Sequence, residues 1–198
     1  SVNNIMIALY AFVVISFFIT IVDIIIRFPL QSEMIDYNDI QAIVINVLAL
    51  LIQIVFFAYG FVNAIRGMLS PKRMGAVIVA FFAATCITGT GNMVINSNVQ
   101  IVLWWIVLII PNIVGAVATF AYFVSGKKSK IYSIIIYLAA IWGMFRIIYS
   151  NYNLIVHANQ YLSMNSTVRL VLGIAIHCLV IYQTYVLWIK RQNAIDIS

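Results

Sequence analysis

Few side chains in this sequence could do chemistry, and the most central is His177, within "GIAIHCLVIYQTY". A histidine in the middle of an apolar run is neutral and hydrogen-bonded, carries protons, contacts a polar solute, or ligates a metal or haem. The other histidine, His157, falls in a loop at a different depth, so a haem held by both histidines is not expected. His177 is therefore the first candidate for contact with a ligand.

Amide side chains supply the next candidates. Asn112 follows Pro111, which removes a backbone donor and predicts a kink near the middle of a membrane helix. A broken helix at mid-membrane favours a binding site, but a kink with a purely structural role also fits. Asn46 and Gln53 are spaced by seven residues, which predicts one shared face directed into the protein. That face would hold helices together or line a polar cavity.

The stretch "GAVIVAFFAATCITGTGNMVI" carries small or polar residues at every fourth position. These residues are Ala76, Ala80, Ala84, Thr88 and Asn92. Small side chains let a neighbouring backbone approach closely, so the face predicts helix packing, either within the protein or against a partner subunit. At the outer end of the face, Thr88 and Asn92 are also candidate contacts for a solute.

Charged side chains near apolar runs form a third group. Asp23 and Arg27, in "TIVDIIIRF", have the i,i+4 spacing of a local ion pair. We expect this pair to anchor its helix at the outer membrane surface, with the arginine extended toward the headgroups. The alternative is that Arg146, near the outer end of another apolar run, competes with Arg27 for Asp23 and ties the two helices together at the rim of a cavity.

The patterns that usually support catalysis within membranes are missing from the sequence. There is no H-E-x-x-H motif, no Ser–His or Ser–Lys pair in a recognisable pattern, and no pair of acids within an apolar run. Cys86 and Cys178 both lie in apolar runs and are expected to be free thiols. We therefore predict no catalytic residues, no metal site and no cofactor, and favour a role other than catalysis.

The composition explains what must position these residues. Hydrophobic residues make up 65% of the 198 residues and charged residues 8%, with a mean hydropathy of +1.09. A soluble protein is about half apolar and a quarter charged, and a helix needs roughly 20 apolar residues to cross a bilayer. The sequence therefore predicts an all-α polytopic integral membrane protein, a six-transmembrane-helix bundle that forms one domain over residues 1–198. The expected helices are approximately residues 5–27, 41–65, 75–95, 100–124, 131–149 and 168–189.

Basic residues in the short connections predict the orientation. They are Arg66, Lys72, Arg73, Lys127, Lys128, Lys130, Lys190 and Arg191. All of them fall on one side of the six expected helices, and Lys and Arg in short loops are retained in the cytoplasm. We therefore expect both termini in the cytoplasm (N-in, C-in) and a location in the plasma membrane. The net charge of +6 is explained by this asymmetry, so no nucleic-acid partner is expected.

The connection before the last helix, residues 150–167, is rich in Asn and Tyr but keeps apolar residues at helical spacing. This pattern predicts an interfacial half-helix across the outer mouth of the bundle. Such a segment would cap the bundle, or act as a lid or a face for a partner.

Three functions are compatible with these residues. The leading hypothesis is a membrane-embedded binding or transport component for a small polar solute, working with partner membrane proteins in the lipid bilayer. The alternative is a non-transporting interaction protein, such as a sensor module, an immunity protein or an accessory subunit. The third is a subunit that binds haem or quinone.

Overall fold

A computed structural model describes residues 2–31, 37–95, 99–152 and 164–195. Six of its helices are long and apolar enough to cross a membrane, and no strand occurs in the described ranges, so the predicted six-helix transmembrane architecture is confirmed. The elements are α1 (Val2–Gln31), α2 (Tyr37–Ile65), α3 (Pro71–Ile95), α4 (Val99–Thr119), the π-helical segment η2 (Phe120–Val124), α5 (Lys130–Ser150) and α8 (Met164–Ile195).

The helices extend beyond the apolar runs from which they were predicted. The largest differences are in the last helix, which begins at Met164 instead of residue 168 and ends at Ile195 instead of residue 189. Backbone hydrogen bonding continues through polar residues at helix ends, whereas hydropathy stops where polar residues begin. Residues 164–167 of the expected interfacial segment therefore belong to α8, and residues 153–163 lie outside the described residues.

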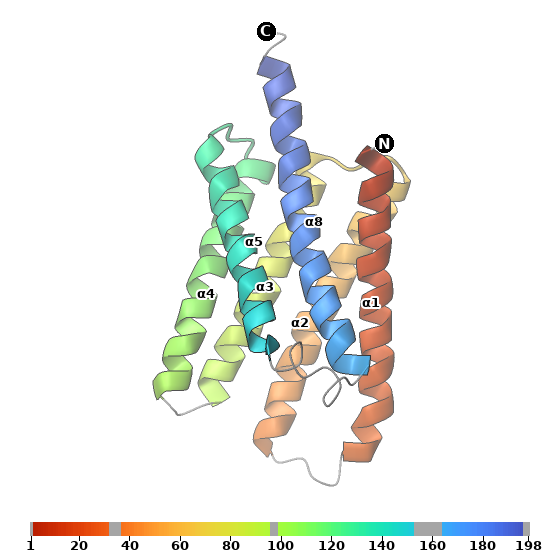
Figure 1. Cartoon of the computed structure of the whole chain (residues 1–198), viewed down its shortest axis with the longest axis vertical. Helices are drawn as coiled ribbons and strands as arrows, with labels where there is room; N and C mark the ends of the chain where they lie inside the picture. Colours follow the sequence, from red (N-terminus) through yellow and green to blue (C-terminus); the bar gives the residue numbers. More distant parts are fainter. Residues whose placement is uncertain (1, 32–36, 96–98, 153–163, 196–198) are drawn as a thin grey trace.

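The helices form a ring in which each packs on the next along the chain, and α8 closes the ring against α1 (Figure 1). Successive helices run in opposite directions, so both termini and the connections 66–70 and 125–129 lie at one end. We call this end, which carries the eight basic residues predicted to be cytoplasmic, the basic end, and the other the opposite end.

The interior of the ring is formed mainly by α3 and α8, which also contact each other across it. Half of the spanning segment of each of these two helices is buried, compared with 17% for α2 and α5. Large apolar side chains such as Val55, Val117 and Leu138 point outward with more than half of their surface exposed. This outer surface is suited to contact with lipid tails.

The small-residue face of α3 lies inside the bundle. Ala80 and Ala84 are buried, and Ala76 and Thr88 are half-buried. Close packing extends to Gly75, where an added Cβ would stand 2.5 Å from the Cβ of Phe123 in η2. These residues bring α3 near its own neighbours in the ring, so the face is not proposed as a docking surface for a partner.

Glycines end two helices at the basic end. Gly67 follows α2 with φ of +66°, and Met68 N donates to Asn63 O at 2.9 Å while Gly67 N donates to Ala64 O at 3.1 Å. These two bonds form a Schellman motif, which requires a left-handed residue. Gly126, with φ of +70°, turns the chain after η2 in the same way.

Candidate functional site

His177 lies where three helices meet. The residue is 4% exposed, and its Nδ1 lies 2.6 Å from the carbonyl oxygen of Gly173, one turn earlier in α8. Because a carbonyl oxygen only accepts, the ring proton is on Nδ1. The ring also meets Phe81 of α3 edge-on, with centroids 5.0 Å apart and planes at 90°.

The third neighbour of His177 is the backbone of α5 at Gly143. Nε2 of the imidazole is so close that a Cβ at Gly143 would clash with it, and Cδ2 of the ring would stand 2.9 Å from that Cβ. Glycine is therefore required on α5 for α8 to place a histidine there. Both ring nitrogens face protein backbone, which leaves neither open to a metal ion or haem iron, so haem ligation by His177 is not proposed.

Arg146 lies on α5 one turn beyond Gly143, toward the opposite end. Its side chain is half-buried, and its Nε atom is buried without a hydrogen-bond partner in the described part of the chain. Arginines at membrane depth usually face a partner or a polar cavity and mark ligand or ion sites. Arg146 is thus a charged group with a buried donor that no described residue satisfies.

A second buried polar contact joins α8 to α1. Gln183 and Tyr10 are both 0% exposed, and Gln183 Nε2 lies 2.6 Å from Tyr10 Oη. The tyrosine ring fits against Gly60 of α2, where a Cβ would clash with it. Gln183 Oε1 is buried and has no hydrogen-bond partner among the described residues.

Sequence reasoning did not select Gln183 or Tyr10. The available signal was a glutamine within the apolar span Leu170–Asn193, because a buried amide in a membrane helix needs partners. Its partner lies 173 residues away along the chain, and no spacing rule connects the two.

Asn112 is satisfied within its own helix. The side chain is 8% exposed, and its Nδ2 donates to Leu108 O at 2.7 Å. α4 continues through Pro111 to Thr119 without a break in its helical assignment. The helix is therefore not interrupted at Pro111, a kink there stays a prediction, and the amide of Asn112 donates to a backbone carbonyl one turn earlier.

The remaining candidates are separated from one another. Asn46 is exposed on α2, Gln53 is half-buried, and both Asn46 and Thr88 make interactions of their own. The shared inward face predicted for α2 thus does not extend to Asn46. Seven residues fall about 20° short of two turns of an ideal helix, so the stripe drifts with each repeat. The side chain of Asn92 lies outside the described residues.

The proposed outer rim is described in part. Asp23 is half-buried on α1 and makes an interaction, whereas the side chain of Arg27 lies outside the described residues. The pairing of Asp23 with Arg27 or with Arg146 stays a prediction.

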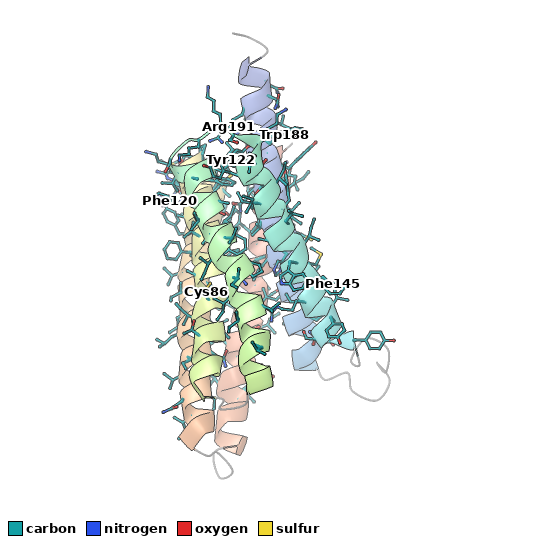
Figure 2. All side chains as sticks on the ribbon, turned by 90° about the vertical axis from the view of Figure 1, so that its left-hand side faces the viewer. Cys86, Phe120, Tyr122, Phe145, Trp188 and Arg191 are labelled. Atoms are coloured by element: carbon teal, nitrogen blue, oxygen red, sulfur yellow. The ribbon has the colours of Figure 1, made fainter. Side chains whose placement is uncertain are left out.

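At the basic end, Arg191 of α8 binds η2 and the connection that follows it (Figure 2). Its guanidinium donates to Tyr122 O at 2.6 Å and to Lys127 O at 3.1 Å, and its Cζ lies 4.2 Å from the centre of the Tyr122 ring. A cation at a helix C-terminus satisfies carbonyls that have no donor within the helix. Arg191 therefore has a structural role that its basic charge alone did not indicate.

Among the candidates, His177 is held by the backbone of Gly143 and Gly173, and Arg146 follows Gly143 by three residues on α5. The structure does not join Asn46, Gln53, Thr88 or Asn112 to this group. No family model, curated protein or solved structure gives a significant match to the chain.

Proposed function

We propose that the protein is a membrane-embedded binding or transport component for a small polar solute, and that it acts with partner subunits. The observation that supports this proposal is the buried Nε atom of Arg146, which has no hydrogen-bond partner in the described part of the chain. A buried donor without a partner costs about 1–3 kcal/mol, and more when it is charged. A protein tolerates such a cost in its ligand-free state when the donor binds a ligand.

The chemistry of Arg146 favours a solute with a carboxylate, phosphate or other electron-rich oxygen. A guanidinium presents its donors in a fixed planar fork that matches such groups. His177 lies nearby but is closed off by Gly143 and Phe81, so it supports the position of α5 against α8 and is not proposed to contact the solute.

The orientation adds the direction of access. With both termini in the cytoplasm of a cell bounded by a plasma membrane, Arg146 lies in the outer half of the bundle. A solute would then reach it from outside.

The alternative function, a non-transporting interaction protein, is favoured by a different observation. Several buried polar side chains are satisfied by the carbonyl one turn earlier in their own helix. They are Thr20, Asn112, Thr119 and Thr184. Such residues need no solute as a hydrogen-bond partner. This is expected for a bundle that binds other proteins through its outer surface.

The test compares small molecules retained by the protein after purification from its native membranes. We expect mass spectrometry to find a solute enriched with the wild type, and Arg146→Gln to weaken its binding about 10- to 100-fold, since a charge-assisted bond contributes roughly 1.5–3 kcal/mol. Arg66→Gln, which removes an exposed charge at the basic end, is the matched control. Retention of the same solute by Arg146→Gln, or a co-purified protein without any solute, would favour the alternative.

A further inference from the structure

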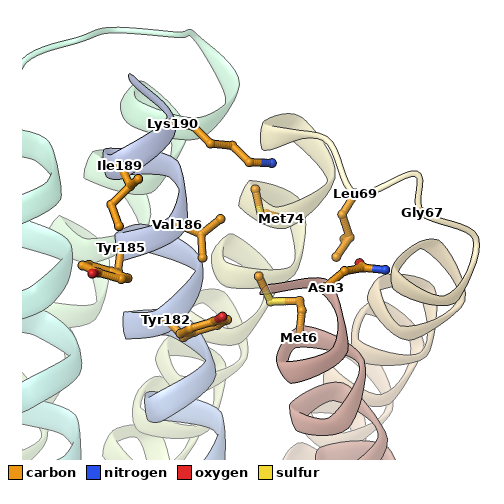
Figure 3. Close-up of a pocket in the computed structure, with 10 residues that line it drawn as sticks. All are labelled: Asn3, Met6, Gly67, Leu69, Met74, Tyr182, Tyr185, Val186, Ile189 and Lys190. Carbon is orange, nitrogen blue, oxygen red and sulfur yellow. The ribbon is translucent and has the colours of Figure 1, made fainter. Parts of the chain in front are cut away.

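A pocket of about 310 Å³ opens at the basic end between α1, α3, α8 and the connection from α2 to α3 (Figure 3). None of the ligand-binding candidates from the sequence lines it, and it lies at the other end of α8 from the Arg146 region. Since a water molecule occupies about 30 Å³ in the liquid, the pocket is large enough for a ligand of several heavy atoms.

The walls of this pocket are apolar and adaptable. Met6 of α1, Met74 of α3 and Val186 of α8 are each buried at 6% exposure or less. Methionine is flexible and polarisable, so it accommodates chains of irregular shape. These walls are suited to the apolar part of a ligand.

The mouth of the pocket is polar and positively charged. Lys190 extends from α8 across the opening, and Asn3 lies on the other side (Figure 3). None of the lining residues is acidic, so the ammonium group of Lys190 meets no carboxylate from the walls. Of the five acidic residues in the sequence, only Asp196 follows Lys190, and it lies outside the described residues.

Neighbouring charges have the same sign. Arg66, Lys72 and Arg73 surround the connection that forms one wall, and Arg73 is already used, because its Nη1 donates to Met68 O at 2.6 Å. A set of like charges above a low-dielectric wall raises the local concentration of anions. Lys190 is the charge within the pocket lining itself.

The depth of the pocket matches the membrane interface. Asn3, Met74 and Lys190 fall in the terminal turns of the apolar spans Asn3–Asp23, Pro71–Gly91 and Leu170–Asn193, and Gly67 and Leu69 lie in the connection beyond the spans. Headgroups lie at this level, and basic pockets between helix ends bind anionic headgroups. Apolar walls, a single cation at the mouth and this position at the ends of the spans together favour a ligand with both an apolar part and an anionic group.

We propose that the basic-end pocket binds an anionic amphiphile, with a phosphate group paired to Lys190 and an apolar segment against Met6, Met74 and Val186. The phosphate belongs to a membrane phospholipid of net negative charge or to a soluble phosphate compound. This site is separate from the solute site at Arg146, so either can fail without the other.

The test uses the full-length protein in nanodiscs and measures bound lipid by native mass spectrometry. We expect phosphatidylglycerol to be retained in preference to phosphatidylcholine, and inorganic phosphate alone to bind at least tenfold more weakly. Equal binding of both lipids would overturn the anionic part of the proposal. Equal binding of inorganic phosphate would overturn the amphiphilic part and indicate the soluble source.

Two variants of pocket residues and one control variant locate the site. Lys190→Gln is expected to weaken phosphatidylglycerol binding about fivefold, as for one basic group near an anionic headgroup. Lys128→Gln removes an exposed charge from the same end outside the pocket and should leave binding unchanged. Leu69→Trp, in the connection that lines the pocket, should exclude the lipid by filling the space. Equal losses from Lys190→Gln and Lys128→Gln, or unchanged binding with Leu69→Trp, would overturn the proposal.

Discussion

Arg191, at the basic end of α8, donates to two backbone carbonyls and lies over the ring of Tyr122, whereas Arg146 of α5 has a buried Nε with no hydrogen-bond partner among the described residues. Both side chains are half-buried and carry the same charge. The difference lies in what the surrounding chain supplies: carbonyl acceptors from η2 and the connection after it for Arg191, and no described hydrogen-bond partner for the Nε atom of Arg146.

This difference separates a structural charge from a functional one. Desolvation of a guanidinium is offset when carbonyl oxygens replace water, and it is not offset when a donor faces apolar atoms. Removing Arg191 should therefore lower the stability of the protein, and removing Arg146 should not. Gln183 is an intermediate case, because one end of its amide is bonded to Tyr10 and the other is not.

The largest effect is expected at Arg191. Arg191→Ala should lower the free energy of unfolding by about 2 kcal/mol, because two carbonyls lose a charged donor and the Tyr122 ring loses its cation. Unfolding in mixed micelles measures this change. Lys128→Ala, which alters an exposed side chain in the nearby connection, should change it by less than about 0.5 kcal/mol. Equal effects of the two variants would show that the contacts of Arg191 contribute nothing.

The next effect concerns the contact between α1 and α8. Gln183→Leu should lower the free energy of unfolding by about 1.5 kcal/mol, because the hydroxyl of Tyr10 is left buried without its partner. Adding Tyr10→Phe should restore most of the loss, since an apolar pair leaves nothing unsatisfied. Unfolding of the single and double variants forms a double-mutant cycle. Additive losses would contradict a direct bond between the two side chains.

The contrast between the two arginines also explains what the sequence could predict. The six spans were located within a few residues, because every backbone group in a bilayer must be bonded within its own segment and apolar length alone identifies such segments. A polar side chain in a span also needs a hydrogen-bond partner, and the amide of Asn112 finds one in its own helix, where it donates to Leu108 O. A polar residue in a span has its own helix as an available partner, and the sequence does not indicate which partner it uses.

The sequence did not predict which side chains meet between helices. The order of the ring decides that Gln183 meets Tyr10 and that His177 meets Gly143, and hydropathy contains no information on that order. His177 was correctly placed in the interior, but the glycine that makes room for its ring is unremarkable in sequence. The pocket near Lys190 could not be anticipated either, because it is formed by parts of three helices and a connection.

The smallest effect is expected at Arg146. It tests the comparison of the two arginines most directly, because the Arg146 variant should gain stability whereas the Arg191 and Gln183 variants should lose it. Arg146→Met keeps an unbranched apolar stem that reaches to the position of Nε and removes the buried donor, so the free energy of unfolding of solute-free protein should rise by about 1 kcal/mol. Arg191→Met, the matched substitution at the satisfied arginine, should lower it. Thermal unfolding of both variants in one detergent gives the two signs directly.

A solute that binds at Arg146 would stabilise the wild type by mass action and leave Arg146→Met unchanged. If Arg146→Met instead loses as much stability as Arg191→Met, Arg146 holds the bundle together, and the proposal of a solute at this position loses its support.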